Sequence, residues 1–247
     1  MTSTSAGPAA TPRLSVVIAV KNEAGNILPL ISEIDAALTE PFELIFVNDG
    51  STDATAAELV EAARTRPYMR IMTHATSCGK SAGVNTGARV ARGDILLLLD
   101  GDGQNNPAYF PAMVRLIDEG GPRVGMVQGE RQGRKDTAFK RFQSRTANRV
   151  RRALLNDDTR DTGCGLKAVR RTVYIALPMF DGLHRFTPAL VKRDGYEIRT
   201  LPVVDRARWH GVSNYGFWNR LWVGIADLLG VWWLIRRRRV PQVVERR

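Results

Sequence analysis

One glycine separates two carboxylates in the segment Asp100-Gly101-Asp102, which directly follows the apolar run Ile95–Leu99. Charged side chains at the end of a buried strand are costly unless something compensates them. The glycine lets both carboxylates approach one ion, and such oxygen ligands suit Mg²⁺ or Mn²⁺, which keep waters and bridge to substrate phosphates. Gln104 could add a neutral oxygen. Asp-Gly pairs are also common in plain turns, so the apolar run before this pair is what favours a metal site.

A second polar cluster runs from Asn48 to Asp53 and follows another apolar run. Asp53 is most simply the cap of a following helix, and Ser51 or Thr52 could share that work. Asp49 is not needed for the cap. It is therefore predicted to be free to accept hydrogen bonds from a base or a ribose, as acidic residues after a second strand do in dinucleotide-binding folds.

The segment from His74 to Ser81 looks like the end of a phosphate-binding loop, with Gly79 and Lys80 before the serine. Position 74 is not glycine, so the segment fails the GxxxxGK[ST] pattern, and a Walker-type ATPase is disfavoured. Lys80 at a helix start could still meet a diphosphate, although a plain glycine-rich helix entry explains the segment equally well. No GxGxxG follows the first apolar run, which counts against a nicotinamide dehydrogenase.

The elements that must position these residues alternate between strand and helix. Strands are predicted at residues 14–20, 42–47, 70–73, 95–99 and 124–127, and helices at 26–38, 53–64 and 81–91, with another from Pro107. This rhythm predicts an α/β fold, a mostly parallel sheet covered by helices on both faces. Such sheets bind ligands at the carboxyl ends of their strands. The segments 21–23, 48–51 and 100–102 follow strands one, two and four, so they are predicted to meet at one edge.

The second half is less regular. A basic helical stretch is expected at residues 134–155, a glycine-rich turn or short strand at 161–166, a strand at 196–204 and a helix at 217–235. Residues 1–12 are small and polar, which predicts a disordered tail without the basic and apolar regions of a signal peptide. Cys78 and Cys164 form neither a CxxC pair nor a disulfide framework, which favours a reduced, cytoplasmic setting.

The formal net charge of +11 points to nucleic acid, anionic lipid headgroups or phosphorylated small molecules as partners. The basic residues lack interleaved aromatics, so no nucleic-acid module is recognisable. Residues 217–235 hold four of the five tryptophans and run into Arg236–Arg239, but their apolar run is shorter than the roughly 20 residues of a spanning helix. We expect an amphipathic helix at a membrane surface. A helix packed on the catalytic part or on a second copy of the chain is the alternative.

Five segments together resemble family 2 glycosyltransferases of the GT-A fold, a Rossmann-like nucleotide-diphospho-sugar transferase fold, and the resemblance runs from about Arg13 to Tyr215. The segments are SVVIAVKNEAGNI, FVNDGSTDAT, GKSAGVNTGARVARGDILLLLDGDGQNNP, DTGCGLKAVRR and RARWHGVSNYG. The closer likeness is to the polyprenyl-phosphate sugar transferases, the dolichol-phosphate mannose synthase-like branch. It implies a GT-A catalytic domain at 13–215, which leaves the disordered tail at 1–12 and the interfacial helix and basic tail at 216–247 outside that domain.

The resemblance also implies an inverting enzyme that uses a UDP- or GDP-sugar donor, Mg²⁺ or Mn²⁺, and a polyprenyl phosphate acceptor. The donor contacts it implies, to which Lys80 is added, are Ala19, Val20, Asn22, Glu23, Asp49, Asp100 and Gly101. The metal ligands are Asp100, Asp102 and Gln104, and the catalytic cluster is Asp102, Asp161 and Lys167. The acceptor phosphate would be met by Arg131, Arg145, Arg206, Arg208 and Ser213. Two departures stand out: Asp-Ala-Asp-Leu-Gln of many members reads DGDGQ here, and Gly-x-Ser-Lys reads GVSN.

An acceptor phosphate is already anionic at neutral pH, so it needs arginine clamps more than a general base. Asp161 is therefore expected to orient groups; a glycolipid or polysaccharide acceptor, the alternative, would make it an indispensable base. The resemblance implies a peripheral enzyme on the inner face of the cytoplasmic membrane, acting in cell-envelope glycan or lipid modification. A separate integral-membrane protein could receive the product. A nucleic-acid binder is the remote alternative, and it explains little besides the charge.

Overall fold

A seven-stranded sheet forms the centre of the computed structural model, which describes residues 11–132, 151, 153–157, 159–209 and 217–239. The strands are β1 (Leu14–Val20), β2 (Phe42–Asp49), β3 (Met69–His74), β4 (Ile95–Leu98), β5 (Val124–Arg131), β6 (Lys167–Arg170) and β7 (Glu197–Val203). Their order is β3-β2-β1-β4-β6-β5-β7. Only β6 among these strands runs against its neighbours β4 and β5, and the other pairings are parallel.

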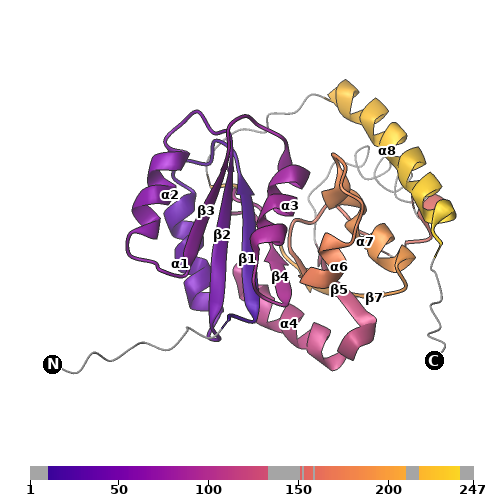
Figure 1. Cartoon of the computed structure of the whole chain (residues 1–247), viewed down its shortest axis with the longest axis horizontal. Coiled ribbons are helices and arrows are strands. Elements are labelled where there is room, and N and C mark those ends of the chain that lie inside the picture. Colours follow the sequence, from indigo (N-terminus) through magenta and orange to yellow (C-terminus); the bar gives the residue numbers. More distant parts are fainter. Residues whose placement is uncertain (1–10, 133–150, 152, 158, 210–216, 240–247) are drawn as a thin grey trace, which may run out of the picture.

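Helices cover both faces of the sheet, as predicted (Figure 1). They are α1 (Ile27–Ala37), α2 (Thr55–Ala63), α3 (Lys80–Val90), α4 (Phe110–Glu119), α6 (Arg171–Ile175), α7 (Leu183–Arg193) and α8 (Phe217–Arg237), with 3₁₀ turns at Pro107–Tyr109 and Gly121–Arg123. One apolar core joins the sheet to α1, α2 and α4, and a second joins it to α3, α6, α7 and α8. The strand β4 is apolar throughout and β1 is apolar except for Ser15, as expected of strands that are buried on both faces.

Two glycines let α3 lie directly on the sheet. A Cβ at Gly83 would come within 2.7 Å of the Ala19 Cβ, and one at Gly87 within 2.3 Å of the Val17 Cγ1. Larger residues would push the helix outward. This close approach brings the first residue of α3, Lys80, to the carboxyl edge of the sheet, where it meets the residue that follows β4.

The first half agrees with the predicted elements to within a few residues. The second half contains three elements that were not predicted, namely β6, α6 and α7. The predicted turn or strand at 161–166 is a turn, and the strand begins just after it at Lys167. Most of the predicted basic helix at 134–155 and the tail at 1–10 lie outside the described residues, and the boundaries at 13, 215 and 216 stay predictions.

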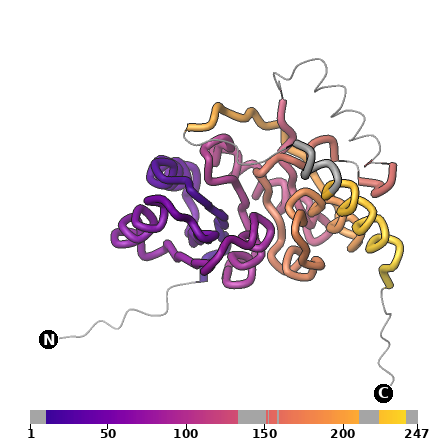
Figure 2. Tube along the Cα trace, turned by 90° about the horizontal axis from the view of Figure 1, so that it is seen from above, coloured from indigo at the N-terminus to yellow at the C-terminus, as the bar shows by residue number. Residues whose placement is uncertain are grey.

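Helix α8 packs along α7 at the side of the molecule away from α1 and α2 (Figures 1 and 2). Val231 on its inner face is buried, whereas Ile225, Leu229 and Trp233 are exposed and recur every four residues. Helix α8 therefore has one apolar side packed on the domain and a second apolar stripe that faces outward. Within the described residues, no helix is long and apolar enough to cross a membrane.

Candidate active site

The polar segments that follow β1 and β2 are joined by hydrogen bonds at the carboxyl edge of the sheet. The backbone N–H of Asn22 donates to the Ser51 hydroxyl at 3.0 Å, and the Thr52 N–H donates to the Asn22 side-chain oxygen at 2.8 Å. Asn22 has a φ of 56°, a left-handed conformation that asparagine tolerates. The predicted meeting of these two clusters is confirmed.

The Asp100-Gly101-Asp102 turn completes this edge. Gly101 lies against the end of β1, because a Cβ there would come within 2.6 Å of the Val20 Cγ1 and 3.5 Å of the Glu23 Cγ. Glycine is thus required at this position for the close approach of the turn to β1. The predicted donor residues of β1 and the carboxylates after β4 therefore share one surface.

Each carboxylate of this turn faces a different cation. The Lys80 ammonium pairs with Asp100, and the Arg208 guanidinium lies 2.8 Å from the Asp102 carboxylate. Burial raises the pKa of Asp100, but Lys80 and Lys167 together lower it below its usual value. Burial and the neighbouring charge of Asp100 raise the pKa of Asp102. The pKa values of these two neighbouring carboxylates are thus shifted in opposite directions. Their oxygens form a hard donor set of the kind that binds Mg²⁺ or Mn²⁺.

The residues predicted for the acceptor phosphate have different surroundings in the structure. Arg131 forms a two-pronged ion pair with Asp161, at 2.6 Å and 2.8 Å, and its third nitrogen lies 3.4 Å from Asp205. Arg208 reaches the Asp102 carboxylate instead. Arg145 and Ser213 lie outside the described residues. The structure thus joins a predicted acceptor residue, Arg131, to a predicted catalytic one, Asp161.

The guanidinium of Arg206 already interacts with several groups of the protein. Its guanidinium forms two hydrogen bonds to Glu33 at 2.6 Å and 2.7 Å, donates to the backbone oxygens of Gly103 and Asn105, and lies over the Trp209 ring. This network ties α1 to the loop after the carboxylate turn. A contact between Arg206 and an acceptor phosphate stays a prediction, and it requires one of these hydrogen bonds to change.

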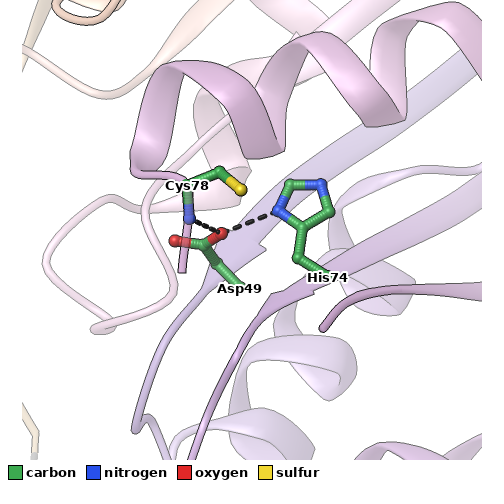
Figure 3. Close-up of side chains that lie close together, drawn as sticks. All are labelled: Asp49, His74 and Cys78. Carbon is green, nitrogen blue, oxygen red and sulfur yellow. Dashed lines mark hydrogen bonds and ion pairs between the residues drawn. The ribbon is translucent and has the colours of Figure 1, made fainter. Parts of the chain in front are cut away.

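Asp49 also differs from the expectation that it is free to bind a base or ribose. Its carboxylate accepts hydrogen bonds from His74 Nδ1 at 2.7 Å and from the Cys78 backbone N–H at 2.8 Å (Figure 3). It also accepts from the Ser77 hydroxyl at 2.7 Å and from the Gly79 backbone N–H at 2.9 Å. Four bonds fill the usual capacity of a carboxylate. Asp49 thus anchors the segment 74–79 before α3, and a nucleoside contact stays a prediction that requires one of these bonds to change.

The side chains of Asp49, His74 and Cys78 bring an oxygen, a nitrogen and a sulfur within 4.8 Å of one another (Figure 3). Such a set could hold a metal in principle. Here both oxygens of Asp49 and both ring nitrogens of His74, the second 2.9 Å from the Thr86 hydroxyl, are engaged by protein groups. We therefore interpret the cluster as a hydrogen-bonded anchor.

Lys167 and Gln104 complete the predicted set. Lys167 is buried at the start of β6, where its ammonium donates to the Cys164 backbone oxygen, and burial followed by Lys80 lowers its pKa to about 8. The Gln104 backbone N–H donates to Asp102 at 3.1 Å. Asn105 was missed: its side-chain oxygen accepts the Asp100 N–H at 3.1 Å and its amide donates to Asp205. Nothing in the local sequence distinguishes that asparagine from its neighbour at 106.

His184, from α7, which the sequence offers only as an alternative polar contact, also belongs to this surface. Its Nδ1 lies 2.8 Å from the Ser81 hydroxyl at the start of α3, and burial, then Lys80 and Lys167, lower its pKa from 6.5 to about 3. The folded protein therefore holds a neutral imidazole down to about pH 3, whereas the unfolded chain binds a proton below about pH 6.5.

Stability is accordingly expected to fall by a few kcal/mol as the pH drops from 6.5 towards 3, because only the unfolded state takes up this proton. Melting temperatures of the wild type and His184→Gln measured across this range test the point. The variant should show a shallower loss on the acid side. Parallel curves would contradict the assignment.

Solved structures share this architecture. A mannosyltransferase of Pyrobaculum calidifontis in complex with GDP-Man and Mn²⁺ superposes with a TM-score of 0.64 at 22% identity over 93% of this chain and 66% of that one. Glucosyl-3-phosphoglycerate synthase of Mycobacterium tuberculosis, in complex with Mn²⁺, UDP-Glc and phosphoglyceric acid, gives 0.66 at 22% identity over 90% and 80%. The fold is that of the GT-A glycosyltransferases, as predicted.

Residues 15–177 match the model of glycosyl transferase family 2. The chain belongs to this family and is a glycosyltransferase. It is 32% identical over 241 residues to a dodecaprenyl-phosphate galacturonate synthase of Rhizobium johnstonii, across 95% of this chain and 70% of that protein. It is 32% identical over 207 residues to an undecaprenyl-phosphate 4-deoxy-4-formamido-L-arabinose transferase of Pseudomonas fluorescens, across 82% and 60%. The chain thus spans less than two thirds of the second relative.

Proposed function

We propose that this glycosyltransferase moves a sugar from a nucleoside-diphosphate donor to a polyprenyl phosphate, with a divalent cation at Asp100 and Asp102. The observation that carries the proposal is the pair of carboxylates at the carboxyl edge of the sheet, with Lys80 on one side and Arg208 on the other. The names of the two relatives support the acceptor, since both act on a polyprenyl phosphate. They differ in their sugar.

The leaving group of such a reaction is a nucleoside diphosphate, whose charge rises as the bond to the sugar breaks. A divalent cation held by Asp100 and Asp102 would neutralise part of that charge. Lys80 at the first residue of α3 adds an ammonium and an N-terminal helix dipole to the same place. Arg208 would release Asp102 to the cation and turn to a phosphate, which guanidinium groups bind well.

The acceptor phosphate needs orientation rather than deprotonation, because it is anionic at neutral pH. Arg131 would supply this, with its guanidinium held at the end of β5 by Asp161 and one of its contacts with Asp161 or Asp205 changing to admit the phosphate. An Asp161 so engaged is a poor proton acceptor, which favours a phosphate over a sugar hydroxyl as the nucleophile. Attack by the phosphate oxygen on the anomeric carbon would expel the diphosphate and invert that carbon.

Donor turnover by the purified protein tests the proposal. UDP- and GDP-sugars are offered with Mn²⁺ or Mg²⁺, with and without a short polyprenyl phosphate. The expected result is that one donor is consumed only when the lipid phosphate and a divalent cation are present. Transfer to a glycan or glycolipid in its place would overturn the acceptor, and failure to bind any nucleotide sugar would overturn the donor site.

We further propose that α8 rests on the inner face of the cytoplasmic membrane, where a polyprenyl phosphate is within reach. Its outward stripe of Ile225, Leu229 and Trp233 leads to the basic residues Arg236 and Arg237, a combination that suits anionic headgroups. A second copy of the chain or an integral-membrane protein could cover the same stripe.

Replacing Leu229 and Trp233 together by serine is expected to weaken binding to vesicles of mixed neutral and anionic lipid by at least about tenfold, because two large apolar side chains no longer leave water. Vesicle flotation measures this, and added salt should weaken the wild type further. Val60→Ser on α2 is the matched control, since Val60 is equally exposed, at 55% like Leu229 and Trp233, but lies on the other half of the molecule. Equal flotation of all three proteins would contradict the proposal.

A further inference from the structure

A small cavity lies beside Asp100, where the start of α3 meets the start of β6 and the helices α6 and α7. Its volume is about 20 Å³, which is room for one or two water-sized groups. Its polar lining residues are Lys80, Asp100, Lys167, Tyr174, His184 and Thr187. The cavity therefore opens from the proposed diphosphate site into the protein.

The charges around the cavity do not balance. Two ammonium groups, Lys80 and Lys167, face a single carboxylate, Asp100, which is already paired with Lys80. Lys167 is only 4% exposed, and its hydrogen bond goes to the backbone oxygen of Cys164. Among the described residues no carboxylate lies within ion-pair distance of Lys167, and Asp100 and Asp161 act on it only at longer range. A buried ammonium without a counterion is costly, so the cavity favours an anion.

The neutral side chains of the lining are hydrogen-bond donors as well. Tyr174 is 1% exposed, and its hydroxyl has no hydrogen-bond partner among the described residues. The Ser81 hydroxyl accepts the backbone N–H of His184 at 3.3 Å, so its own proton is directed to His184 Nδ1. The proton of the neutral His184 imidazole is therefore on Nε2, and this N–H is a second neutral donor beside the Tyr174 hydroxyl. A buried hydroxyl without a partner is a feature that calls for a ligand.

We propose that this cavity receives the carboxylate of the donor's sugar, so that the sugar transferred is a uronic acid or another acidic sugar. The inference rests on the proposed function, because it places the sugar beside the residues proposed to hold the diphosphate. A planar group with two oxygens matches both the volume and the convergence of ammonium, hydroxyl and imidazole donors. A neutral hexose would leave the charge of Lys167 unmatched.

Donor binding, measured by calorimetry with Mn²⁺, tests this inference without requiring transfer. UDP-galacturonate and UDP-glucuronate are compared with UDP-galactose and UDP-glucose, and GDP-mannuronate with GDP-mannose, with UDP and GDP alone as references. The acidic donors are expected to bind at least about tenfold more tightly than their neutral counterparts. Tyr174→Phe should lower that preference by about tenfold to hundredfold, since one hydrogen bond to a charged group is lost. Lys167→Met should lower it at least as much.

Tyr196→Phe is the matched control, because it removes a tyrosine hydroxyl outside the cavity lining and should leave the preference unchanged. Thermal melting confirms that each variant is folded. Equal binding of acidic and neutral donors would overturn the inference, while transfer of a neutral sugar to the lipid would leave the proposed function standing. Loss of affinity for a short polyprenyl phosphate in Tyr174→Phe, with sugar preference intact, would assign the cavity to the acceptor phosphate and overturn the inference. Failure of UDP and GDP themselves to bind would overturn both.

Discussion

Replacing Asp102 by asparagine is expected to lower the rate of sugar transfer by about 10³-fold or more at saturating donor. Asparagine keeps the shape of the side chain but removes the negative charge that would hold a divalent cation on the leaving diphosphate. It also leaves the Arg208 guanidinium, 2.8 Å from the present carboxylate, without its partner. Losing a single electrostatic contact to a transition state costs about 10² to 10³ in rate, and here the cation is lost with it.

Steady-state rates and Mn²⁺ binding, measured on the same samples, separate the causes. Both should fall in Asp102→Asn, and raising the Mn²⁺ concentration should restore only part of the rate. Asp118→Asn is the control, because Asp118 is an exposed carboxylate on α4 that also pairs with an arginine, Arg13. Unchanged Mn²⁺ affinity in Asp102→Asn would reduce the turn to a structural feature and remove the basis of the proposed donor site.

Replacing Asp161 by alanine is expected to destabilise the protein by about 3 kcal/mol and to lower transfer by at least about 10²-fold. The side chains of Arg131 and Asp161 are 19% and 13% exposed, and breaking a buried ion pair leaves a buried charge unmatched. Asp205, 3.4 Å from Arg131, compensates for part of the loss. Urea unfolding followed by circular dichroism measures the first effect, and transfer to the lipid phosphate measures the second.

The double variant Arg131→Met with Asp161→Leu distinguishes a structural role from a functional one. Apolar residues of similar size often replace a buried pair without loss of stability, so the double variant should regain most of the 3 kcal/mol. It should stay inactive, because no guanidinium remains to orient the acceptor phosphate. Recovery of transfer in the double variant would show that the pair serves the fold alone.

The pH profile separates the two acceptor hypotheses for Asp161. If Asp161 removed a proton from a sugar hydroxyl, Asp161→Asn would abolish the acid limb of the rate profile. If the acceptor is a phosphate, the acid limb should persist and follow the second ionisation of the phosphate, near pH 6. The two-pronged contact with Arg131 favours the second outcome.

The first half of the chain could be predicted closely because its information is local. The runs that became β1, β2 and β4 are mostly apolar, interrupted by Ser15 in β1 and Glu43 in β2, and polar residues stand at or just after the end of each run. A parallel sheet places those strand ends on one edge whatever the details of the helices. The meeting of Asn22 with Ser51, and of Gly101 with Val20, followed from that rule alone.

The second half could not be read in the same way. The strand β6 is four residues long and antiparallel to its neighbours, so no periodicity marks it. Its position nevertheless decides the site, because it carries the Lys167 ammonium beneath the carboxylate turn and aligns Gly165 against Asp100. Helix α7 then brings His184 to Ser81, which lies 103 residues earlier in the chain.

By itself the sequence determined the class of fold, and it predicted the edge proposed to bind ligands and the carboxylate turn on which the proposed chemistry centres, since strand pattern and turn residues are local properties. Only the tertiary structure decided how the charges are shared. Arg206 is taken up by Glu33 on α1, 173 residues away, whereas Arg131 is held by Asp161. The carboxylate of Asp49 accepts hydrogen bonds from the backbone of the loop before α3. The sequence around an arginine or aspartate does not indicate its ion-pair partner. The role of such a residue depends on which opposite charge the packing of distant elements places within reach.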